Sequence, residues 1–217
     1  MHFPDEGQAI EYWNHRIRSW ESSRYGALAS LKPNSFAVYH RLRTAQKILN
    51  GEPLDSLLDV GCGSGFLAMG LRPQRELKYF GYDSSSEAVK LAKTRNFPGL
   101  ISADFQVCDV STADIPKTTI TVALGLVDWL SDKQLTSLFA RLSSPKLLLA
   151  FTERRSNPLS LLYHLYHGQE IGSEMRYPRE FSLDEILKLT AGAGYRLLRQ
   201  HRSWFLGLGV LLELEKL

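Results

Sequence analysis

The segment LLDVGCGSGF, residues 57–66, constrains the fold of this chain more than any other feature. Its short apolar run is followed by glycine at alternate positions, Gly61, Gly63 and Gly65. Glycine has no Cβ atom, so a loop of this kind turns sharply or lets its backbone approach another group closely. The segment therefore predicts a strand, a tight turn and a helix, and it raises the question of what approaches the turn.

The sequence after residue 54 repeats this pattern of short apolar runs and amphipathic segments, which predicts parallel strands joined by helices. We expect strands at 56–60, 77–82, 104–108, 119–125 and 146–152, and helices at 65–71, 85–96 and 131–143. The first 50 residues predict helices, one of them with Ser35 as N-cap and Gly51 just past its end. A last helix has Ser182 as N-cap, with Glu185 completing a capping box. It precedes two strands that we expect to pair antiparallel at the sheet edge.

The composition argues against several classes of protein. The chain of 217 residues has a formal net charge of +3 and no long run of Lys or Arg, so a nucleic-acid partner is not favoured. Two cysteines are too few for a disulfide framework, and no apolar stretch reaches the roughly 20 residues that cross a membrane. The polar N-terminus does not read as a signal peptide. We therefore expect a cytoplasmic protein without a membrane span, either a monomer or a homodimer.

The glycine loop is a poor match to phosphate-binding loops. The pyrophosphate fingerprint G-x-G-x-x-G would require glycine where Phe66 stands, and no Gly-Lys-Ser/Thr follows the loop. LLDVGCGSGF instead resembles the first motif of class I S-adenosylmethionine-dependent methyltransferases of the small-molecule type, and the resemblance extends over about 55–153. It implies an α/β fold: a Rossmann-like, doubly wound, mostly parallel seven-stranded sheet with an antiparallel C-terminal strand, plus N-terminal helices.

The resemblance also implies S-adenosyl-L-methionine as the cofactor. Asp83 in YFGYDSS would hold the ribose hydroxyls, because a carboxylate accepts two charge-assisted hydrogen bonds from a vicinal diol. Asp109 in FQVCDV would face the adenine amino group. The loop holds no Lys or Arg, which suits a cofactor that carries a sulfonium but no phosphate. The residues expected to bind the cofactor are Asp59, Gly61, Cys62, Gly63, Gly65, Asp83, Ser84, Asp109, Val110, Leu124 and Gly125.

Some of these roles have alternatives. Asp59 would instead brace the loop, and Asp104 or Asp114 would replace Asp109 if the third strand were shifted in register. Cys62 is interpreted as a buried structural thiol rather than a nucleophile, because no base partner is evident.

We predict a single domain over residues 1–217. It comprises an N-terminal helical cap (1–53), a cofactor-binding core (54–155), a lid or substrate insertion (156–181), and a C-terminal helix and hairpin (182–217). A long insertion at the carboxyl end of a sheet is commonly a substrate-binding element.

The sequence defines the acceptor side less sharply. The catalytic residue is unknown, and the candidates are His164, His167 and Asp128; the two histidines would otherwise be solvated on a packing helix. A metal site, which would need Glu170 as a further ligand, is not expected. Arg154 and Arg155, directly after the fifth strand, would meet an anionic group of the acceptor or remain solvated. The residues expected to contact the acceptor are Trp13, Leu126, Asp128, Trp129, Tyr163 and Tyr166.

These observations predict S-adenosylmethionine-dependent methyl transfer to a small-molecule acceptor with apolar or aromatic bulk. LGLVDW stands at the fourth strand in place of an Asn-Pro-Pro-Tyr-type signature, which disfavours methylation of DNA adenine or protein glutamine. Two alternatives stay open: a non-catalytic S-adenosylmethionine-binding regulatory or accessory protein, and a nicotinamide-dependent oxidoreductase, which Phe66 disfavours. Clustering of arginines on one face would revive a nucleic-acid substrate, and the arginines in question are Arg16, Arg18, Arg24, Arg41 and Arg43.

Overall fold

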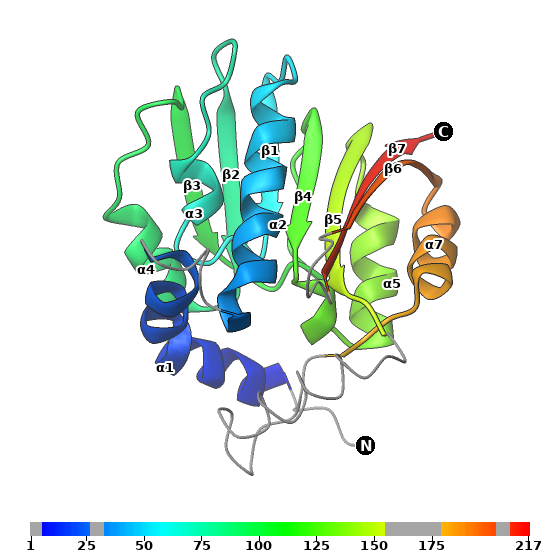
Figure 1. Cartoon of the computed structure of the whole chain (residues 1–217), viewed down its shortest axis with the longest axis horizontal. Helices are drawn as coiled ribbons and strands as arrows, with labels where there is room; N and C mark the ends of the chain where they lie inside the picture. Colours follow the sequence, from blue (N-terminus) through cyan, green and yellow to red (C-terminus); the bar gives the residue numbers. More distant parts are fainter. Residues whose placement is uncertain (1–5, 27–32, 155–178, 203–208) are drawn as a thin grey trace.

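A seven-stranded sheet with the strand order β3-β2-β1-β4-β5-β7-β6 forms the centre of the molecule (Figure 1). The structure is a computed structural model that describes residues 6–26, 33–154, 179–202 and 209–217. The strands are β1 (Ser56–Val60), β2 (Lys78–Asp83), β3 (Ser102–Val107), β4 (Ile120–Leu124), β5 (Lys146–Thr152), β6 (Tyr195–Arg202) and β7 (Gly209–Lys216). The described helices are α1 (Glu6–Tyr25), α2 (Pro33–Asn50), α3 (Phe66–Met69), α4 (Ser86–Lys93), α5 (Asp132–Arg141) and α7 (Leu183–Gly192), with the short 3-10 helix η2 (Val127–Trp129).

The sheet is doubly wound, and this arrangement creates a ligand edge. Strands β1 to β5 pair in parallel, whereas β7 runs antiparallel to both β5 and β6. The strand order reverses between β1 and β4, which is the switch point where open α/β sheets bind their ligands. The predicted fold class is therefore confirmed, and so is the antiparallel C-terminal pair with β6 at the edge of the sheet.

Helices cover both faces of the sheet because the side chains of a strand alternate between its faces. In β5, Leu147, Leu149 and Phe151 pack into the cluster that includes α5 and α7. Leu148 and Ala150, between them, face the cluster that includes α2, α3 and α4. Both faces of this strand are thus buried, which explains its nearly continuous apolar sequence.

The helices α1 and α2 take different places relative to the sheet. α2 buries Leu42 and Leu49 against one face, whereas α1 lies across the ends of the strands (Figure 1). The predicted N-cap at Ser35 is wrong, because α2 begins at Pro33, and the fixed φ of proline suits the first helical turn. The Ser35 hydroxyl instead donates to the Ser23 carbonyl of α1 at 2.9 Å, so it connects the two helices.

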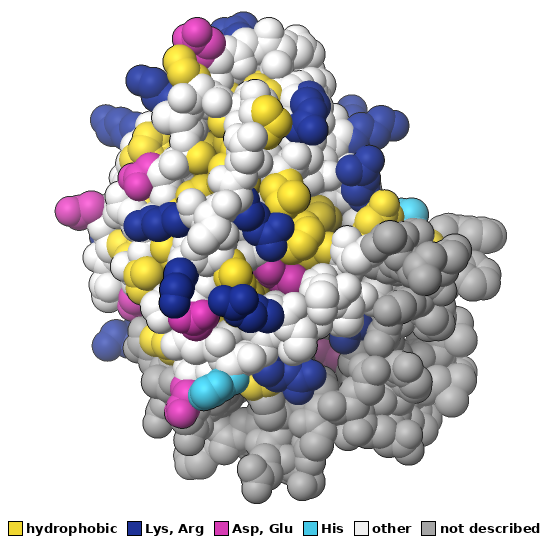
Figure 2. All heavy atoms as spheres, turned by 90° about the vertical axis from the view of Figure 1, so that its left-hand side faces the viewer, with side chains coloured by type: hydrophobic (Ala, Val, Ile, Leu, Met, Phe, Trp, Pro, Cys, Tyr) yellow, Lys and Arg dark blue, Asp and Glu magenta, His cyan; other side chains and the backbone are white. Residues whose placement is uncertain are grey.

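The charges on the described surface are dispersed. Figure 2 shows the side of the molecule that carries β3 and α4, where Lys and Arg side chains lie among Asp, Glu and hydrophobic ones. Three of the arginines named above have different surroundings: Arg18 lies 3.6 Å from Glu87, whereas Arg24 and Arg41 line a cavity. None of the described helices is both long and apolar enough to cross a membrane.

Replacement of Ser182 with alanine tests the cap of α7. The Ser182 hydroxyl accepts a hydrogen bond from the Glu185 N–H at 3.2 Å, and the Ser182 N–H donates to the Glu185 carboxylate at 2.7 Å. We expect Ser182→Ala to lower the free energy of unfolding by about 1 kcal/mol, measured by urea denaturation. Lys188→Ala, at an exposed position of the same helix, is the control and should change this free energy by less than about 0.5 kcal/mol. Equal stability of Ser182→Ala and wild type would contradict the cap.

Candidate functional site

A cavity of about 320 Å³ lies at the carboxyl ends of β1, β2 and β4, with residues of α1 forming part of its lining. It adjoins the switch point between β1 and β4, where the fold predicts a ligand. The predicted cofactor residues that line it are Asp59, Gly61, Cys62, Gly63, Asp83, Ser84, Asp109, Val110, Leu124 and Gly125. The predicted acceptor residues that line it are Trp13, Leu126, Asp128 and Trp129.

The glycine loop joins β1 to α3 through residues in the left-handed region. The φ angles of Gly61, Gly63 and Gly65 are +74°, +54° and +81°, values that residues with a Cβ atom adopt rarely. Gly61 and Gly63 line the cavity, but Gly65 does not. A Cβ atom at Gly65 would lie 3.0 Å from Phe97 and 3.3 Å from Phe105. This glycine therefore permits tight packing at the start of α3, and its contact with the cofactor stays a prediction.

Asp83 ends β2 and is held by the backbone on both sides. Its Oδ2 accepts a hydrogen bond from the Gly63 N–H at 2.8 Å, and its Oδ1 accepts one from the Ser85 N–H at 2.8 Å. Burial raises the pKa of Asp83, and the two backbone bonds oppose this shift because they stabilise the ionised form. A carboxylate has about four lone-pair sites, so both oxygens can accept further bonds from a ligand.

Asp59 lies at the base of the loop and is buried. The Tyr79 hydroxyl of β2 donates a hydrogen bond to its Oδ2. The pKa of Asp59 is raised to about 7, mainly by burial; the bond from Tyr79 lowers it and the charge of Asp83 raises it. Asp59 thus borders the cavity and also ties β1 to β2, so the two roles that the sequence left open coincide in one side chain.

Of the three acids considered near the third strand, Asp109 is the one that lines the cavity. It follows β3, and its carboxylate accepts bonds from the Ser111 N–H at 2.8 Å and the Ser111 hydroxyl at 2.7 Å. Asp104 is exposed within β3 and accepts a bond from Gln106 at 2.7 Å, and Asp114 is also exposed. The strand register therefore brings Asp109 to the cavity rather than Asp104 or Asp114.

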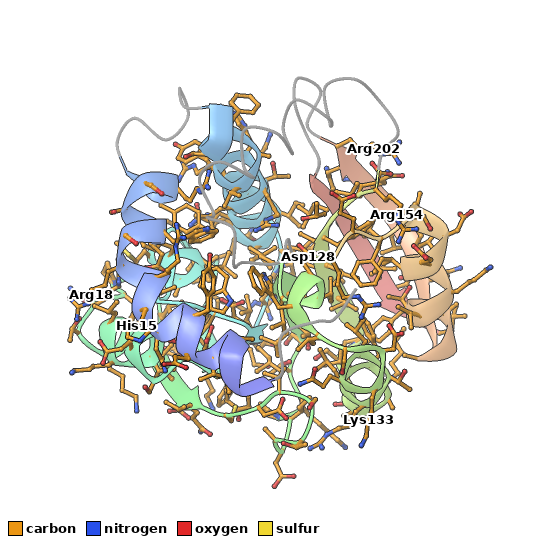
Figure 3. The ribbon with its side chains drawn as sticks, turned by 90° about the horizontal axis from the view of Figure 1, so that it is seen from below. His15, Arg18, Asp128, Lys133, Arg154 and Arg202 are labelled. Atoms are coloured by element: carbon orange, nitrogen blue, oxygen red, sulfur yellow. The ribbon has the colours of Figure 1, made fainter. Side chains whose placement is uncertain are left out.

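Asp128 belongs to η2 and lies near the middle of the molecule when it is viewed from the cavity side (Figure 3). Its Oδ1 accepts a bond from the Thr152 N–H at 3.0 Å, and its Oδ2 accepts one from the Thr152 hydroxyl at 2.9 Å. Burial raises the pKa of Asp128 to about 6, whereas the bonds from Thr152 and the charge of Arg41 favour the ionised form. A carboxyl group held in this way can orient a nucleophile or accept a proton from it near neutral pH.

Glu21 and Asn14 connect α1 to the loop region. The Glu21 carboxylate accepts a bond from the Ser64 N–H at 2.9 Å and another from the Ser64 hydroxyl. The side-chain oxygen of Asn14 accepts a bond from the Ser85 hydroxyl at 2.8 Å. The bonded residues are 43 and 71 positions apart, respectively, and sequence reasoning missed both contacts because no local pattern marks them.

Several aromatic side chains from α1 and η2 line the cavity. We call four of them the aromatic wall: Tyr12, Trp13, Trp20 and Trp129. Tyr12 stacks on Trp129 with ring centroids 5.7 Å apart, and Trp13 meets the same ring edge-on at 5.0 Å. Trp13 also contacts Trp20 at 5.4 Å. The structure thus brings together Trp13 and Trp129, which the sequence predicted separately as acceptor residues.

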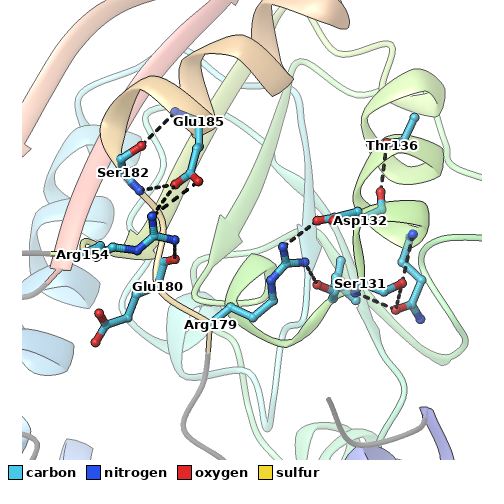
Figure 4. Close-up of polar contacts among 10 residues, drawn as sticks. Ser131, Asp132, Thr136, Arg154, Arg179, Glu180, Ser182 and Glu185 are labelled. Atoms are coloured by element: carbon cyan, nitrogen blue, oxygen red, sulfur yellow. Dashed lines mark hydrogen bonds and ion pairs between the residues drawn. The ribbon is translucent and has the colours of Figure 1, made fainter. Parts of the chain in front are cut away.

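The other predicted residues fall into two groups. The following lie outside the described residues: Arg155, Tyr163, His164, Tyr166, His167 and Glu170. Arg154 is turned to α7 and the segment before it, where it donates to the Glu180 carbonyl at 2.8 Å and lies 3.4 Å from the Glu185 carboxylate (Figure 4). Within the described part of the chain, no three His, Cys, Asp or Glu side chains gather where they could hold a metal ion.

Comparison with known proteins identifies the core of the chain. Residues 57–144 match the model of a family described as a methyltransferase domain. The sequence of this segment is similar to that of a methyltransferase domain. The segment contains the glycine loop, Asp83, Asp109 and Asp128, and the predicted resemblance to class I S-adenosylmethionine-dependent methyltransferases is confirmed. A methyltransferase domain of this class implies S-adenosylmethionine as its cofactor. No curated protein matched the sequence significantly.

Solved structures of other proteins share the fold of nearly the whole chain. Magnesium protoporphyrin IX methyltransferase (ChlM) from Synechocystis PCC 6803, solved with bound SAH, is 16% identical; the match covers 99% of this chain and 100% of that one, with a TM-score of 0.75. A TehB-like SAM-dependent methyltransferase from Corynebacterium glutamicum is 17% identical, with 98% and 100% of the two chains covered and a TM-score of 0.62. The [4+2]-cyclase SpnF is 15% identical, with 100% and 98% covered and a TM-score of 0.72. Because the three identities are only 15% to 17%, the similarity shows a shared fold alone.

The raised pKa of Asp59 predicts how stability changes with pH. An aspartate ionises near pH 3.9 in an unfolded chain, whereas Asp59 in the folded chain ionises near pH 7. Between these values the folded state binds more protons, so the stability that the protonated carboxyl provides is complete below about pH 4 and is lost as the pH rises to about 7. Asp59→Asn keeps an acceptor for the Tyr79 hydroxyl but cannot ionise, so the variant should not show this loss.

Urea denaturation at about pH 4, 5.5 and 7 measures this effect. The difference in unfolding free energy should move in favour of Asp59→Asn as the pH rises, by at most about 1.4 kcal/mol per pH unit. Asp184→Asn, at an exposed position, should follow the pH profile of the wild type. A difference between Asp59→Asn and wild type that does not vary with pH would contradict the raised pKa.

Proposed function

We propose that the chain is an S-adenosylmethionine-dependent methyltransferase that acts on a small-molecule acceptor with apolar or aromatic bulk. The geometry of Asp83 carries this proposal. The Gly63 and Ser85 N–H groups, each at 2.8 Å, orient its two oxygens, and their remaining lone pairs suit a vicinal diol such as that of a ribose. A nucleoside cofactor without phosphate fits this arrangement, because the glycine loop beside Asp83 carries no cationic side chain.

Residues at the ends of three neighbouring strands, β1, β2 and β3, would hold the cofactor. Asp83 would bind the ribose, Asp109 would accept a bond from the adenine amino group, and Val110 would pack beside the ring. Gly61 and Gly63 would let the loop backbone lie against the amino-acid portion. When bound, S-adenosylmethionine supplies a methyl group on a positively charged sulfur atom. The chain therefore needs to position the acceptor and exclude water, and it has no need to form a covalent bond with either ligand.

The aromatic wall supports an acceptor with apolar or aromatic bulk. Flat apolar molecules stack on exposed ring faces or meet ring edges, and Trp13 and Trp129 border the cavity in such positions. α1, which carries most of the wall, is fixed over the cavity by Glu21 and Asn14, an arrangement that suits a small molecule better than a polymer. ChlM, which is named for a tetrapyrrole substrate, is an example of this fold with a flat acceptor.

Asp128 is our candidate for the residue that orients the acceptor or removes its proton. It lines the cavity beside Trp129, and Thr152 fixes both of its oxygens. With a pKa raised to about 6, its carboxyl group is mostly ionised at pH 7 and can accept a proton. A base is required only where the nucleophile must lose a proton, so the role depends on the acceptor. His164 and His167 remain the alternative candidates.

A second candidate function is binding of S-adenosylmethionine without methyl transfer, in a regulatory or accessory protein. SpnF shares the fold over 98% of its chain and is named a [4+2]-cyclase. Its name shows that this fold also occurs in a protein that is not called a methyltransferase. Such a protein would bind the cofactor in calorimetry but would not release S-adenosylhomocysteine with any acceptor.

Calorimetric titration with S-adenosylmethionine, S-adenosylhomocysteine and NADH tests the cofactor. We expect micromolar binding of the first two and no binding of NADH. Asp83→Ala should bind S-adenosylhomocysteine about 100-fold more weakly, because charge-assisted bonds to the ligand and the anchor of the loop are lost. Asp104→Ala removes an exposed carboxylate from the neighbouring strand and should bind like the wild type. Folded wild-type protein, free of co-purified ligand, that binds neither sulfur ligand would refute the proposal.

An assay for release of S-adenosylhomocysteine in the presence of candidate acceptors tests the reaction. We expect turnover with flat apolar acceptors such as quinols or tetrapyrroles, and none with RNA or DNA. Trp129→Ala should raise KM for the acceptor about 10-fold, because a stacking ring is lost, with little change in cofactor affinity. Tyr39→Ala removes an aromatic ring outside the cavity lining and should leave KM unchanged. If Trp129→Ala has the KM of the wild type, the aromatic wall is not the acceptor site.

A further inference from the structure

The short 3-10 helix η2 carries both Asp128 and Trp129, and its last carbonyl groups need hydrogen-bond donors from outside the helix. The chain turns directly from η2 into the cap of α5, where the Ser131 N–H donates to the Gln134 side chain at 3.0 Å. This N–H is the one that would otherwise continue the 3-10 pattern to the Asp128 carbonyl. The carbonyls of Asp128 and Leu130 are therefore satisfied by another part of the chain.

Arg179, from the segment that precedes α7, supplies both donors. Its backbone N–H donates to the Asp128 carbonyl at 2.8 Å, and its Nη1 donates to the Leu130 carbonyl at 2.7 Å. Trp129 lies between these two residues in the chain, so Arg179 fixes the backbone on either side of it. The same guanidinium donates through Nη2 to Asp132, the first residue of α5, at 2.5 Å (Figure 4).

Arg179 is itself held in place. Its side chain is 16% exposed, and its guanidinium carbon lies 4.7 Å from the centre of the Phe181 ring, which is buried. The Phe181 N–H donates to the Thr152 carbonyl of β5 at 3.0 Å. Thr152 also donates to both carboxylate oxygens of Asp128. The end of β5 thus anchors Asp128 through its side chain and, by way of Arg179, through its backbone.

We propose that Arg179 is a positioning residue of the acceptor site, an inference that rests on the proposed function. It holds η2 so that Trp129 and Asp128 face the cavity. Among the described residues, Glu180 lines the cavity but Arg179 does not. The charges that shift the pKa of Asp128 are those of Arg41 and Glu180, so Arg179 acts through geometry rather than through charge. The planar guanidinium suits this role because its separate nitrogen atoms reach a carbonyl and a carboxylate at once.

Fluorine NMR of protein labelled with 5-fluorotryptophan tests the position of Trp129 without any ligand. The chain has four tryptophans, and the signal that disappears in Trp129→Phe is that of Trp129. We expect Arg179→Gln and Arg179→Lys to shift or broaden this signal, because neither side chain reproduces the fork of the guanidinium. Calorimetry should give both variants the wild-type affinity for S-adenosylhomocysteine, which shows that they are folded.

Arg154→Gln is the matched control. Arg154 also donates to a backbone carbonyl, that of Glu180, and it lies 3.4 Å from the carboxylate of Glu185 in the first turn of α7. It is not among the described residues that line the cavity, so Arg154→Gln should keep the Trp129 signal of the wild type. A Trp129 signal that is unchanged in both Arg179 variants would overturn the proposal.

Acceptor kinetics separate a positioning role from a general loss of stability. With the quinol or tetrapyrrole that gives turnover, Arg179→Gln should raise KM for the acceptor about 10-fold and leave KM for S-adenosylmethionine unchanged. In the Trp129→Ala background the same substitution should raise KM for the acceptor by less than about 2-fold, because Arg179 acts through Trp129. Effects that multiply to about 100-fold in the double variant would mean that Arg179 acts independently of Trp129, and would overturn the proposal.

The outcomes separate this inference from the proposed function. Folded wild-type protein that binds no S-adenosylhomocysteine overturns the proposed function, and the role of Arg179 in acceptor binding with it. If the wild type binds S-adenosylhomocysteine, an unchanged Trp129 signal or multiplying KM effects overturn the role of Arg179 alone. If it binds S-adenosylhomocysteine but none of the acceptors gives turnover, the Trp129 signal decides the role of Arg179.

Discussion

The hydrogen bond from the Gly63 N–H to the Asp83 carboxylate is the contact on which the rest of the site depends. It links the loop after β1 to the end of β2, 20 residues further along the chain. Gly63 has a left-handed backbone, and the next N–H along the loop, that of Ser64, donates to Glu21 of α1. A Cβ atom at Gly63 would lie 3.0 Å from the Glu21 carboxylate, so a larger residue would disturb both the loop and the docking of the helix. The position of α1 over the cavity thus follows from the shape of the loop.

The cavity presents charges of both signs, and their balance suits a zwitterionic ligand. Burial raises the pKa of Glu21, Asp59 and Asp83, so the protein only partly stabilises the negative charge near the glycine loop. A positively charged group in the cavity would stabilise the ionised carboxylates, and by linkage the ionised carboxylates would favour its binding. Arg41 lies beside Gly125, close to the same loop, and contributes the opposite charge. The amino-acid portion of the proposed cofactor carries an ammonium and a carboxylate, and therefore matches this arrangement.

The sequence predicted the framework of the molecule because the signals for it are local. The expected strands at 56–60 and 146–152 have the observed bounds, and the acid at the end of β2 could be located from the strand pattern alone. The errors and omissions occur where distant segments meet. The close approach of Gly65 to Phe97 and Phe105 is not visible in its spacing, and Ser35 is not the N-cap of α2 because that helix begins at Pro33. Glu21, Asn14 and Arg41 could not be found from the sequence, because each acts on a partner that no periodicity or spacing connects to it.

The residues proposed to hold the cofactor and those proposed to contact the acceptor come largely from different segments of the chain. The match to a methyltransferase domain, residues 57–144, contains Asp83, Asp109 and the glycine loop, whereas most of the aromatic wall comes from α1, before that segment. The loop is constrained by its backbone geometry, whereas the aromatic side chains of α1 in the wall pack on one another and on Trp129. Substitutions there could change the acceptor while the Gly63–Asp83 contact stays intact. One core could then carry acceptors of very different shape, because the residues that would recognise the acceptor lie mostly on a helix added to it.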